Sequence, residues 1–153
     1  MDDANTLIPV NPAIENYMQK LLEKVASLSS FPIVGRLIGA FLETQAKMVN
    51  AKRVFEFGSG YGYSAYWFAR AVGEGGRVIC SDSNPINCER AEKYLSDADL
   101  WKRLDFRVGK AQDVFMQTDG LFDICYNDVD KGDYPEVWQL ARQRIRSGGL
   151  YIA

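Results

Sequence analysis

The chain has 153 residues, 47% of them hydrophobic and 25% charged, which is ordinary for a globular domain with its own core. Its net charge is −2 and it has no basic run, which argues against nucleic acid as the main partner. No apolar stretch is long enough to span a bilayer, and the start Met1-Asp2-Asp3 does not fit a signal peptide. We therefore expect a cytoplasmic protein with no membrane partner.

The chain contains no histidine, so Ser-His, Cys-His and histidine-based metal chemistry are excluded. Any metal ion would have to be held by oxygen ligands. The three cysteines, Cys80, Cys88 and Cys125, lack the spacing of metal ligands. Because Cys80 and Cys125 fall in predicted strands, we expect buried free thiols in a reducing cytosol.

Two helices are predicted ahead of the first strand, within residues 1–50. Each carries one apolar stripe at helical spacing. The first begins at Pro12 and its stripe holds Ile14, Tyr17, Met18, Leu21, Leu22, Val25 and Leu28. The second follows a break at residues 29–32 and its stripe holds Val34, Leu37, Ile38, Phe41, Leu42, Met48 and Val49. These stripes predict packing on the sheet or on a second subunit, and a homodimer through the helices is one expectation.

The stretch from Arg53 to Ser64 predicts a strand, a glycine loop and a helix start. A short apolar run is followed by glycines at positions 58, 60 and 62, and the helical segment ends at Gly73. Glycines let the backbone turn sharply and approach a ligand, and a helix start offers free N–H groups to an anion. A tight turn without a ligand is the alternative reading.

A second strand is predicted from Arg77 to Ser81 and ends at Asp82. An acid at this position, about 20 residues beyond a glycine loop, is suited to accept hydrogen bonds from two ribose hydroxyls. Alternatively, Asp82 caps a turn, since Asn84-Pro85 has turn character. The next helix is expected over residues 85–96, with its inward side chains at Ile86, Ala91, Tyr94 and Leu95.

Two further strands are predicted, Leu104–Val108 near a sheet edge and Leu121–Asn127. Beyond the second lie Asp128, Asp130 and Lys131, where parallel sheets bind ligands. The following helix should start with Asp133 as N-cap and Pro135 in the first turn. Its inward positions are Val137, Leu140, Ala141 and Ile145, and Arg142, Arg144 and Arg146 are expected to form a solvated face. A fifth strand begins near residue 147.

The alternation of strands and helices predicts an α/β fold with a doubly wound, mostly parallel sheet. We expect one domain over residues 1–153, with N-terminal helices in 1–50 and the sheet in 51–153. Tyr61, Tyr126 and Trp138 could contact a planar substrate, but packing in the core is the preferred interpretation for each.

The motif E-F-G-S-G-Y-G-Y-S resembles motif I of S-adenosylmethionine-dependent methyltransferases. Its trailing G-Y-S looks most like the cation-dependent small-molecule O-methyltransferases of the catechol and caffeoyl-CoA group. The resemblance implies a Rossmann-like methyltransferase fold, S-adenosylmethionine as cofactor, and N-terminal helices that close over the site or form a dimer. The cofactor-binding residues that it implies are Glu56, Gly58, Ser59, Gly60, Gly62, Ser64, Asp82, Ser83, Ala111, Gln112, Asp128 and Asp130.

Within this resemblance, Glu56, Gly58 and Ser64 face the methionine end of the cofactor, and Gln112 meets the exocyclic amine of adenine. The alternative for Gln112 is a solvated residue in the first turn of a short helix. The resemblance also implies that Asp128 binds a divalent cation such as Mg²⁺ near the transferred methyl group. Lys131 would then act as the base or orient the substrate hydroxyl. Alternatively, the acids of this segment are simple loop residues.

The chain departs from the resembled family at its end. The family's further metal ligands, an acidic residue and an asparagine, follow strand five, and here the chain stops at Ala153. We expect a sheet truncated at strand five and a fragment of a longer enzyme; the other possibilities are that the sequence omits these ligands or that no metal is needed.

The predicted function is therefore O-methylation of a small hydroxylated, catechol-like molecule. The alternatives are a catalytically silent cofactor-binding protein and an NAD(P)-dependent oxidoreductase. The oxidoreductase is disfavoured by the glycine spacing and by the lack of a recognisable hydride-transfer acid.

Overall fold

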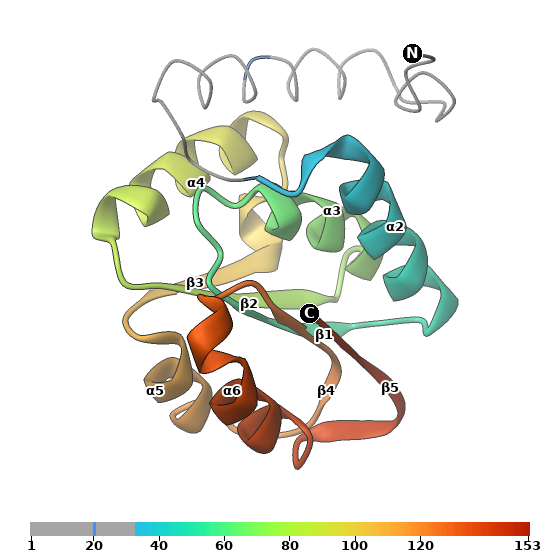
Figure 1. Ribbon diagram of the computed structural model, residues 1–153. Coiled ribbons are helices and arrows are strands. Elements are labelled where there is room, and N and C mark those ends of the chain that lie inside the picture. Colours follow the sequence, from blue (N-terminus) through green and yellow to red (C-terminus); the bar gives the residue numbers. More distant parts are fainter. Residues whose placement is uncertain (1–19, 21–32) are drawn as a thin grey trace, which may run out of the picture.

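The computed structural model describes residues 20 and 33–153. Residues 33–153 form one five-stranded parallel sheet with helices on both faces (Figure 1). The strand order is β3-β2-β1-β4-β5. The strands are β1 (Arg53–Phe57), β2 (Arg77–Asp82), β3 (Leu104–Val108), β4 (Phe122–Asn127) and β5 (Ile145–Ile152). The first predicted helix, from Pro12, lies outside the described residues.

The helices divide between the two faces of the sheet. Figure 1 shows α2, α3 and α4 on one face and α5 and α6 on the other. Their bounds are α2 (Gly35–Met48), α3 (Tyr63–Val72), α4 (Pro85–Asp97), α5 (Ala111–Met116) and α6 (Tyr134–Ala141), with short 3-10 turns η2 (Trp101–Arg103) and η3 (Lys131–Asp133). The predicted doubly wound fold is confirmed, and β3 lies at a sheet edge as its alternation indicated.

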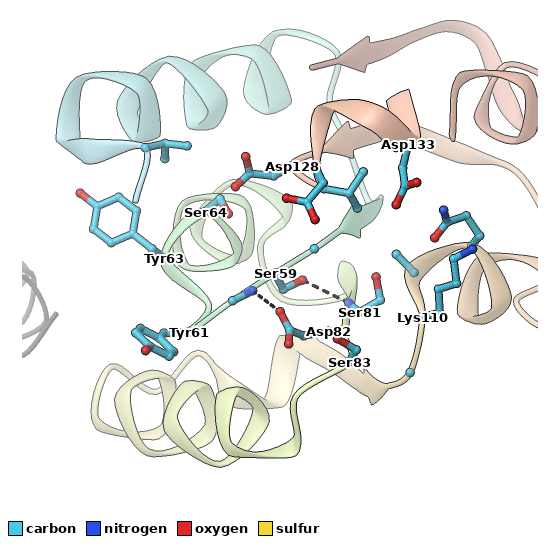
Figure 2. A pocket seen from close by; sticks show the side chains of 18 of the residues that line it. Ser59, Tyr61, Tyr63, Ser64, Ser81, Asp82, Ser83, Lys110, Asp128 and Asp133 are labelled. Carbon is cyan, nitrogen blue, oxygen red and sulfur yellow. Dashed lines mark hydrogen bonds between the residues drawn. The ribbon is translucent and has the colours of Figure 1, made fainter. Parts of the chain in front are cut away.

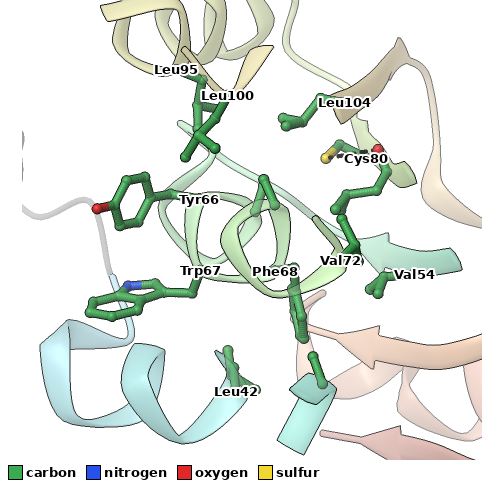
Figure 3. Packing of buried hydrophobic residues seen from close by; sticks show 14 of the residues in the cluster. Leu42, Val54, Tyr66, Trp67, Phe68, Val72, Cys80, Leu95, Leu100 and Leu104 are labelled. Atoms are coloured by element: carbon green, nitrogen blue, oxygen red, sulfur yellow. Dashed lines mark hydrogen bonds between the residues drawn. The ribbon is translucent and has the colours of Figure 1, made fainter. Parts of the chain in front are cut away.

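Strand β1 separates two apolar clusters because successive side chains of a strand point to opposite faces. Val54 belongs to the cluster around α3, and Phe55 and Phe57 belong to the cluster under α5 and α6. Figure 3 shows the first cluster, in which Trp67 and Phe68 of α3 pack with side chains from the neighbouring elements. Glu56 is two residues after Val54, so its carboxyl group points to the α3 face at the carboxyl end of the sheet.

Most members of the apolar stripe predicted for α2 do not pack on the sheet, and their contact with a second subunit stays a prediction. Leu42 is fully buried, but Leu37, Ile38, Phe41 and Met48 are exposed. The buried residues of α2 are Gly39, Leu42, Glu43 and Ala46. The reason is the close contact between α2 and α3: a Cβ atom built on Gly39 would lie 2.0 Å from Nε1 of Trp67. The large apolar side chains are therefore turned outward.

The predicted burial of Ile86 is also wrong, since its side chain is 51% exposed. Asn84 caps α4 by accepting a hydrogen bond from the Ile86 N–H, and the helix turns Asn87 inward instead. The other inward residues predicted for this helix, Ala91, Tyr94 and Leu95, are buried. Because Asn87 is polar, the hydrophobic periodicity of the sequence could not predict that it is buried.

The end of the chain differs from the prediction because α6 stops at Ala141 and Ile145 already belongs to β5. Two of the arginines expected on a solvated face are engaged. Arg144 donates to the carbonyl oxygen of Phe115 (3.0 Å), and Arg146 forms an ion pair with Asp123. These contacts hold the irregular start of β5, where the pairing register with β4 shifts.

Free thiols are confirmed for all three cysteines, and Cys80 and Cys125 are fully buried in β2 and β4. In the described part of the chain, no helix has both the length and the apolar character that a membrane crossing requires.

Candidate active site

A pocket of about 430 Å³ opens at the carboxyl ends of the central strands (Figure 2). This volume is in the range of small-molecule sites, and the position is where parallel α/β sheets bind ligands. The lining side chains come from the loops after β1, β2, β3 and β4 and from the residues before α2. They are Ile33, Val34, Gly58, Ser59, Gly60, Tyr61, Tyr63, Ser64, Ser81, Asp82, Ser83, Gly109, Lys110, Ala111, Gln112, Asp128, Val129, Asp130 and Asp133.

The glycine loop after β1 is fixed by the end of the neighbouring strand. The N–H groups of Gly58 and Ser59 both donate to the carbonyl oxygen of Ser81, at 3.1 and 2.8 Å. Gly58 has φ +81°, and a Cβ there would lie 2.9 Å from the carbonyl oxygen of Asp128. Both the backbone angle and the space require glycine at this position. The loop is thereby held against the segment that follows β4.

The carboxyl group of Glu56 lies beneath the wall of the pocket rather than on its surface. It is completely buried, and the hydroxyl of Ser64 at the start of α3 donates a hydrogen bond to its Oε1 atom. The other oxygen, Oε2, is buried and has no hydrogen-bond partner in the described part of the chain. Burial raises the pKa of Glu56 to about 8, although the Ser64 hydrogen bond acts in the opposite direction. Ser64 itself lines the pocket.

Asp82 at the end of β2 is held by three protein donors. Its Oδ2 accepts from the N–H of Gly60 (3.0 Å), and its Oδ1 accepts from the N–H of Asn84 (2.8 Å) and from the side chain of Asn87 (3.0 Å). A carboxylate has about four lone-pair sites, so the remaining capacity lies mainly on Oδ2. Asp82 therefore fills the capping role that was its alternative, and its contact with a ribose stays a prediction.

The segment after β3 forms the far end of the pocket. The N–H of Gly109 donates to the carbonyl oxygen of Asp82 (2.9 Å), which ties this segment to β2. Lys110, Ala111 and Gln112 all line the pocket. The solvated alternative for Gln112 is wrong: its side chain is only 4% exposed and its Nε2 donates to Glu136 (3.0 Å).

The acids after β4 line the opposite wall. Asp128, Asp130 and Asp133 face the pocket, and the Asp128 N–H donates to the Phe57 carbonyl oxygen (2.9 Å). The surrounding protein raises the pKa of Asp128 to about 6 by desolvation. Lys131 is exposed at the start of η3 and stands outside the lining residues. Asp133 occupies the N-cap position of α6 but its side chain makes no capping hydrogen bond, so only the position of the predicted cap is right.

The described residues do not form a complete metal site. Among them, no group of three or more acidic or cysteine side chains is close enough together to hold an ion. Asp128 is therefore a single candidate ligand, and the divalent cation stays a prediction.

Comparison with known proteins shows the family of this chain. The sequence model of a family described as O-methyltransferase matches residues 11–153. The chain belongs to the O-methyltransferase family. This membership agrees with the resemblance carried by the glycine motif and leaves no support for a dinucleotide-dependent oxidoreductase.

Several members of the family resemble the chain in sequence or structure. The catechol O-methyltransferase of Niastella koreensis is 36% identical over 119 residues, which cover 75% of this chain and 54% of the relative. The caffeoyl-CoA O-methyltransferase 2 of Zea mays is 31% identical over 73% of this chain and 45% of the relative. The structure of the O-methyltransferase from Bacillus cereus, in complex with SAH, has a TM-score of 0.80 at 27% identity and covers 94% of this chain and 66% of its own. The chain spans about half the length of the curated relatives it matches.

Several lining or supporting residues had no signal in the sequence. Tyr63 lines the pocket, although only its neighbours in the glycine motif were predicted as site residues, and Asp133 lines it, although the sequence suggested only an N-cap role. Asn87 and Glu136 contact predicted site residues from helices that looked like ordinary amphipathic segments. Such contacts join residues far apart in the chain, and no local motif encodes them.

Proposed function

We propose that the protein is an S-adenosylmethionine-dependent O-methyltransferase acting on a small hydroxylated molecule of catechol type. The observation that carries the proposal is the single pocket in which the glycine loop, Asp82, the segment 109–112 and Asp128 meet. Membership of the O-methyltransferase family supports it, as does the SAH named for the Bacillus cereus relative.

In this proposal the cofactor lies along the pocket from the glycine loop to residues 109–112. Its carboxylate meets the free N–H groups at the start of α3, where Ser64 lines the pocket. Its ammonium group lies over the part of the wall that covers Glu56, whose buried Oε2 has no hydrogen-bond partner in the described part of the chain. The ribose meets Asp82, and the adenine meets Ala111 and Gln112.

The chemical step is an in-line displacement at the methyl carbon. The substrate oxygen forms a bond to that carbon, the carbon–sulfur bond breaks, and S-adenosylhomocysteine leaves with the bonding electron pair. The hydroxyl proton must be removed, because a phenol with a pKa of about 10 is mostly neutral at pH 7. We assign its acceptance to Asp128, whose pKa of about 6 suits a general base. Lys131, three residues further on, would orient the hydroxyl.

The proposal extends to association and location. Leu37, Ile38 and Phe41 form an exposed apolar face on α2, which supports a homodimer through this helix. The free thiols of all three cysteines support a reducing, cytoplasmic setting. No step is assigned to a metal ion.

The test is methyl transfer from radiolabelled S-adenosylmethionine to catechol and to caffeoyl-CoA, with and without Mg²⁺. Product formation that Asp128→Asn reduces and Asp97→Asn does not is the expected result. Cofactor binding without transfer to any tested hydroxyl compound would instead favour the catalytically silent alternative.

A further inference from the structure

Gln112 is held in one orientation by a residue from a different helix. Its side chain lies in the first turn of α5, is almost completely buried and lines the pocket. Its Nε2 donates to Oε2 of Glu136, in the first turn of α6, at 3.0 Å. The two residues are 24 positions apart, so the contact depends on how α5 and α6 pack.

The chemistry of this contact determines which end of the amide faces the ligand. An ionised carboxylate can accept hydrogen bonds but cannot donate them, so Glu136 selects the amide orientation in which nitrogen faces α6. The ammonium group of Lys110 lies 3.9 Å from the same carboxylate oxygen and adds a favourable opposite charge. Within the described part of the chain, the structure shows no hydrogen bond to Oε1 of Gln112. The amide therefore offers an acceptor to whatever lies beside it.

The position of Gln112 in the pocket indicates which part of a ligand this acceptor would meet. The Gly109 N–H donates a hydrogen bond to the carbonyl oxygen of Asp82, so the segment 109–112 lies next to the proposed ribose acid. A nucleoside whose ribose meets Asp82 thus presents its base to Ala111 and Gln112. A purine with a 6-amino group offers a donor to Oε1, whereas a purine with a 6-oxo group offers a second acceptor and leaves both oxygens unpaired.

We propose that Glu136 is a positioning residue that makes the pocket select an adenine over a 6-oxopurine by fixing the amide of Gln112. This inference rests on the proposed function, since it assumes that the pocket binds an adenosyl cofactor. Glu136 itself is exposed at the edge of the pocket wall and acts only through Gln112.

The experiment is calorimetric titration of S-adenosylhomocysteine and of S-inosylhomocysteine into the wild type and into Glu136→Gln, Glu136→Ala and Glu89→Gln. Glu89 is an exposed glutamate on α4 and serves as the matched control. The wild type should bind the adenosyl ligand at least about tenfold more tightly, the usual effect of leaving a buried acceptor unpaired. In Glu136→Gln the preference should fall to about threefold or less, mainly through tighter binding of the inosyl ligand, because the freed amide can turn. Glu136→Ala should also lower the preference for the adenosyl ligand, and Glu89→Gln should keep the wild-type preference.

The two possible failures can be distinguished. A wild-type protein that binds both ligands equally, or Glu136 variants that keep the wild-type ratio, would overturn the role of Glu136 and leave the proposed function intact. A folded wild type that binds neither ligand would contradict the proposed function itself. A ratio is insensitive to a general loss of folded protein, so a merely structural effect of the substitutions would leave it unchanged.

Discussion

The hydroxyl of Ser64 donates to one oxygen of the buried Glu56 carboxyl group, while the other oxygen has no hydrogen-bond partner in the described part of the chain. A half-satisfied buried carboxyl group is costly unless it is neutral or gains a partner. Burial keeps the proton on Glu56, since its pKa is raised to about 8. An ammonium group bound in the pocket above this carboxyl group would favour the ionised form through its charge.

The affinity for S-adenosylhomocysteine should therefore rise with pH up to about 8. Below that pH the protein must release the Glu56 proton when the ammonium group binds within about 4–6 Å, and this release opposes binding. Calorimetry in two buffers of different ionisation enthalpy measures the proton release directly. Glu56→Gln should abolish both the release and this part of the pH dependence; an unchanged release in that variant would exclude Glu56 as its source.

The carboxyl group of Glu56 should also make the stability of the ligand-free protein depend on pH. The ordinary pKa of a glutamate is 4.5 and the folded value is about 8, so between these values the folded protein holds a proton that the unfolded chain has released. The contribution of Glu56 is thus fully present below about pH 4.5 and is lost as the pH rises through about 8. Urea denaturation of the wild type and Glu56→Gln at pH 5, 7 and 9 checks this. The free energy of unfolding of the variant, relative to the wild type, should increase with pH.

The protonation of Asp128 should control how the activity falls at acidic pH. Because its pKa is about 6, the carboxylate that accepts the substrate proton forms as the pH rises through that value. Asp128→Asn should lower kcat/KM about 100-fold or more and remove the limb near pH 6, the usual range for loss of a general base. Asp97→Asn changes an exposed acid at the end of α4 and should leave the pH profile unaltered. A variant profile with the same limb would assign the base elsewhere.

Gly39→Ala should destabilise the protein because its Cβ would lie 2.0 Å from Nε1 of the buried Trp67. Either α2 or the indole ring must move, and such overpacking costs about 1–3 kcal/mol. Gly132→Ala is the matched control, since no atom lies within 4 Å of the added Cβ there. Thermal denaturation compares the two variants. Equal melting temperatures would show that α2 does not rest on α3 as described.

The exposed face of α2 should mediate self-association. Phe41→Glu places a charge on this face and should convert a dimer to a monomer in light scattering at high protein concentration. Ile86→Glu alters another exposed apolar side chain, on α4, and should have no such effect. A wild type that stays monomeric across the concentration range would contradict the proposed dimer.

The sequence predicted the strands, the glycine loop and the order of the site segments because these follow local rules. The run Val54–Phe57 and the glycines after it define a βα unit by themselves, and the structure has that unit at the centre of its sheet. The buried face of α2 escaped prediction because hydrophobic periodicity favours large side chains, whereas contact with Trp67 required the small Gly39. The exposure of Ile86 escaped prediction for a related reason, because the helix turns the polar Asn87 inward, where its side chain donates to Asp82.

The site was predictable only to the level of single segments. Asp82 and Asp128 could be named because each follows a strand whose carboxyl end opens on the pocket. The contact between Gln112 and Glu136 depends on the packing of α5 against α6, which no local pattern specifies.

The most direct test of the account is calorimetric titration of S-adenosylhomocysteine into the wild type, Asp82→Asn and Asp99→Asn. Asp82 lines the pocket, whereas Asp99 is an exposed acid in the connector before η2. We predict micromolar binding by the wild type and by Asp99→Asn, and binding at least about tenfold weaker by Asp82→Asn, the usual effect of losing a hydrogen bond to a charged group. No heat of binding from a wild type that circular dichroism shows to be folded would contradict the assignment of the pocket to this cofactor.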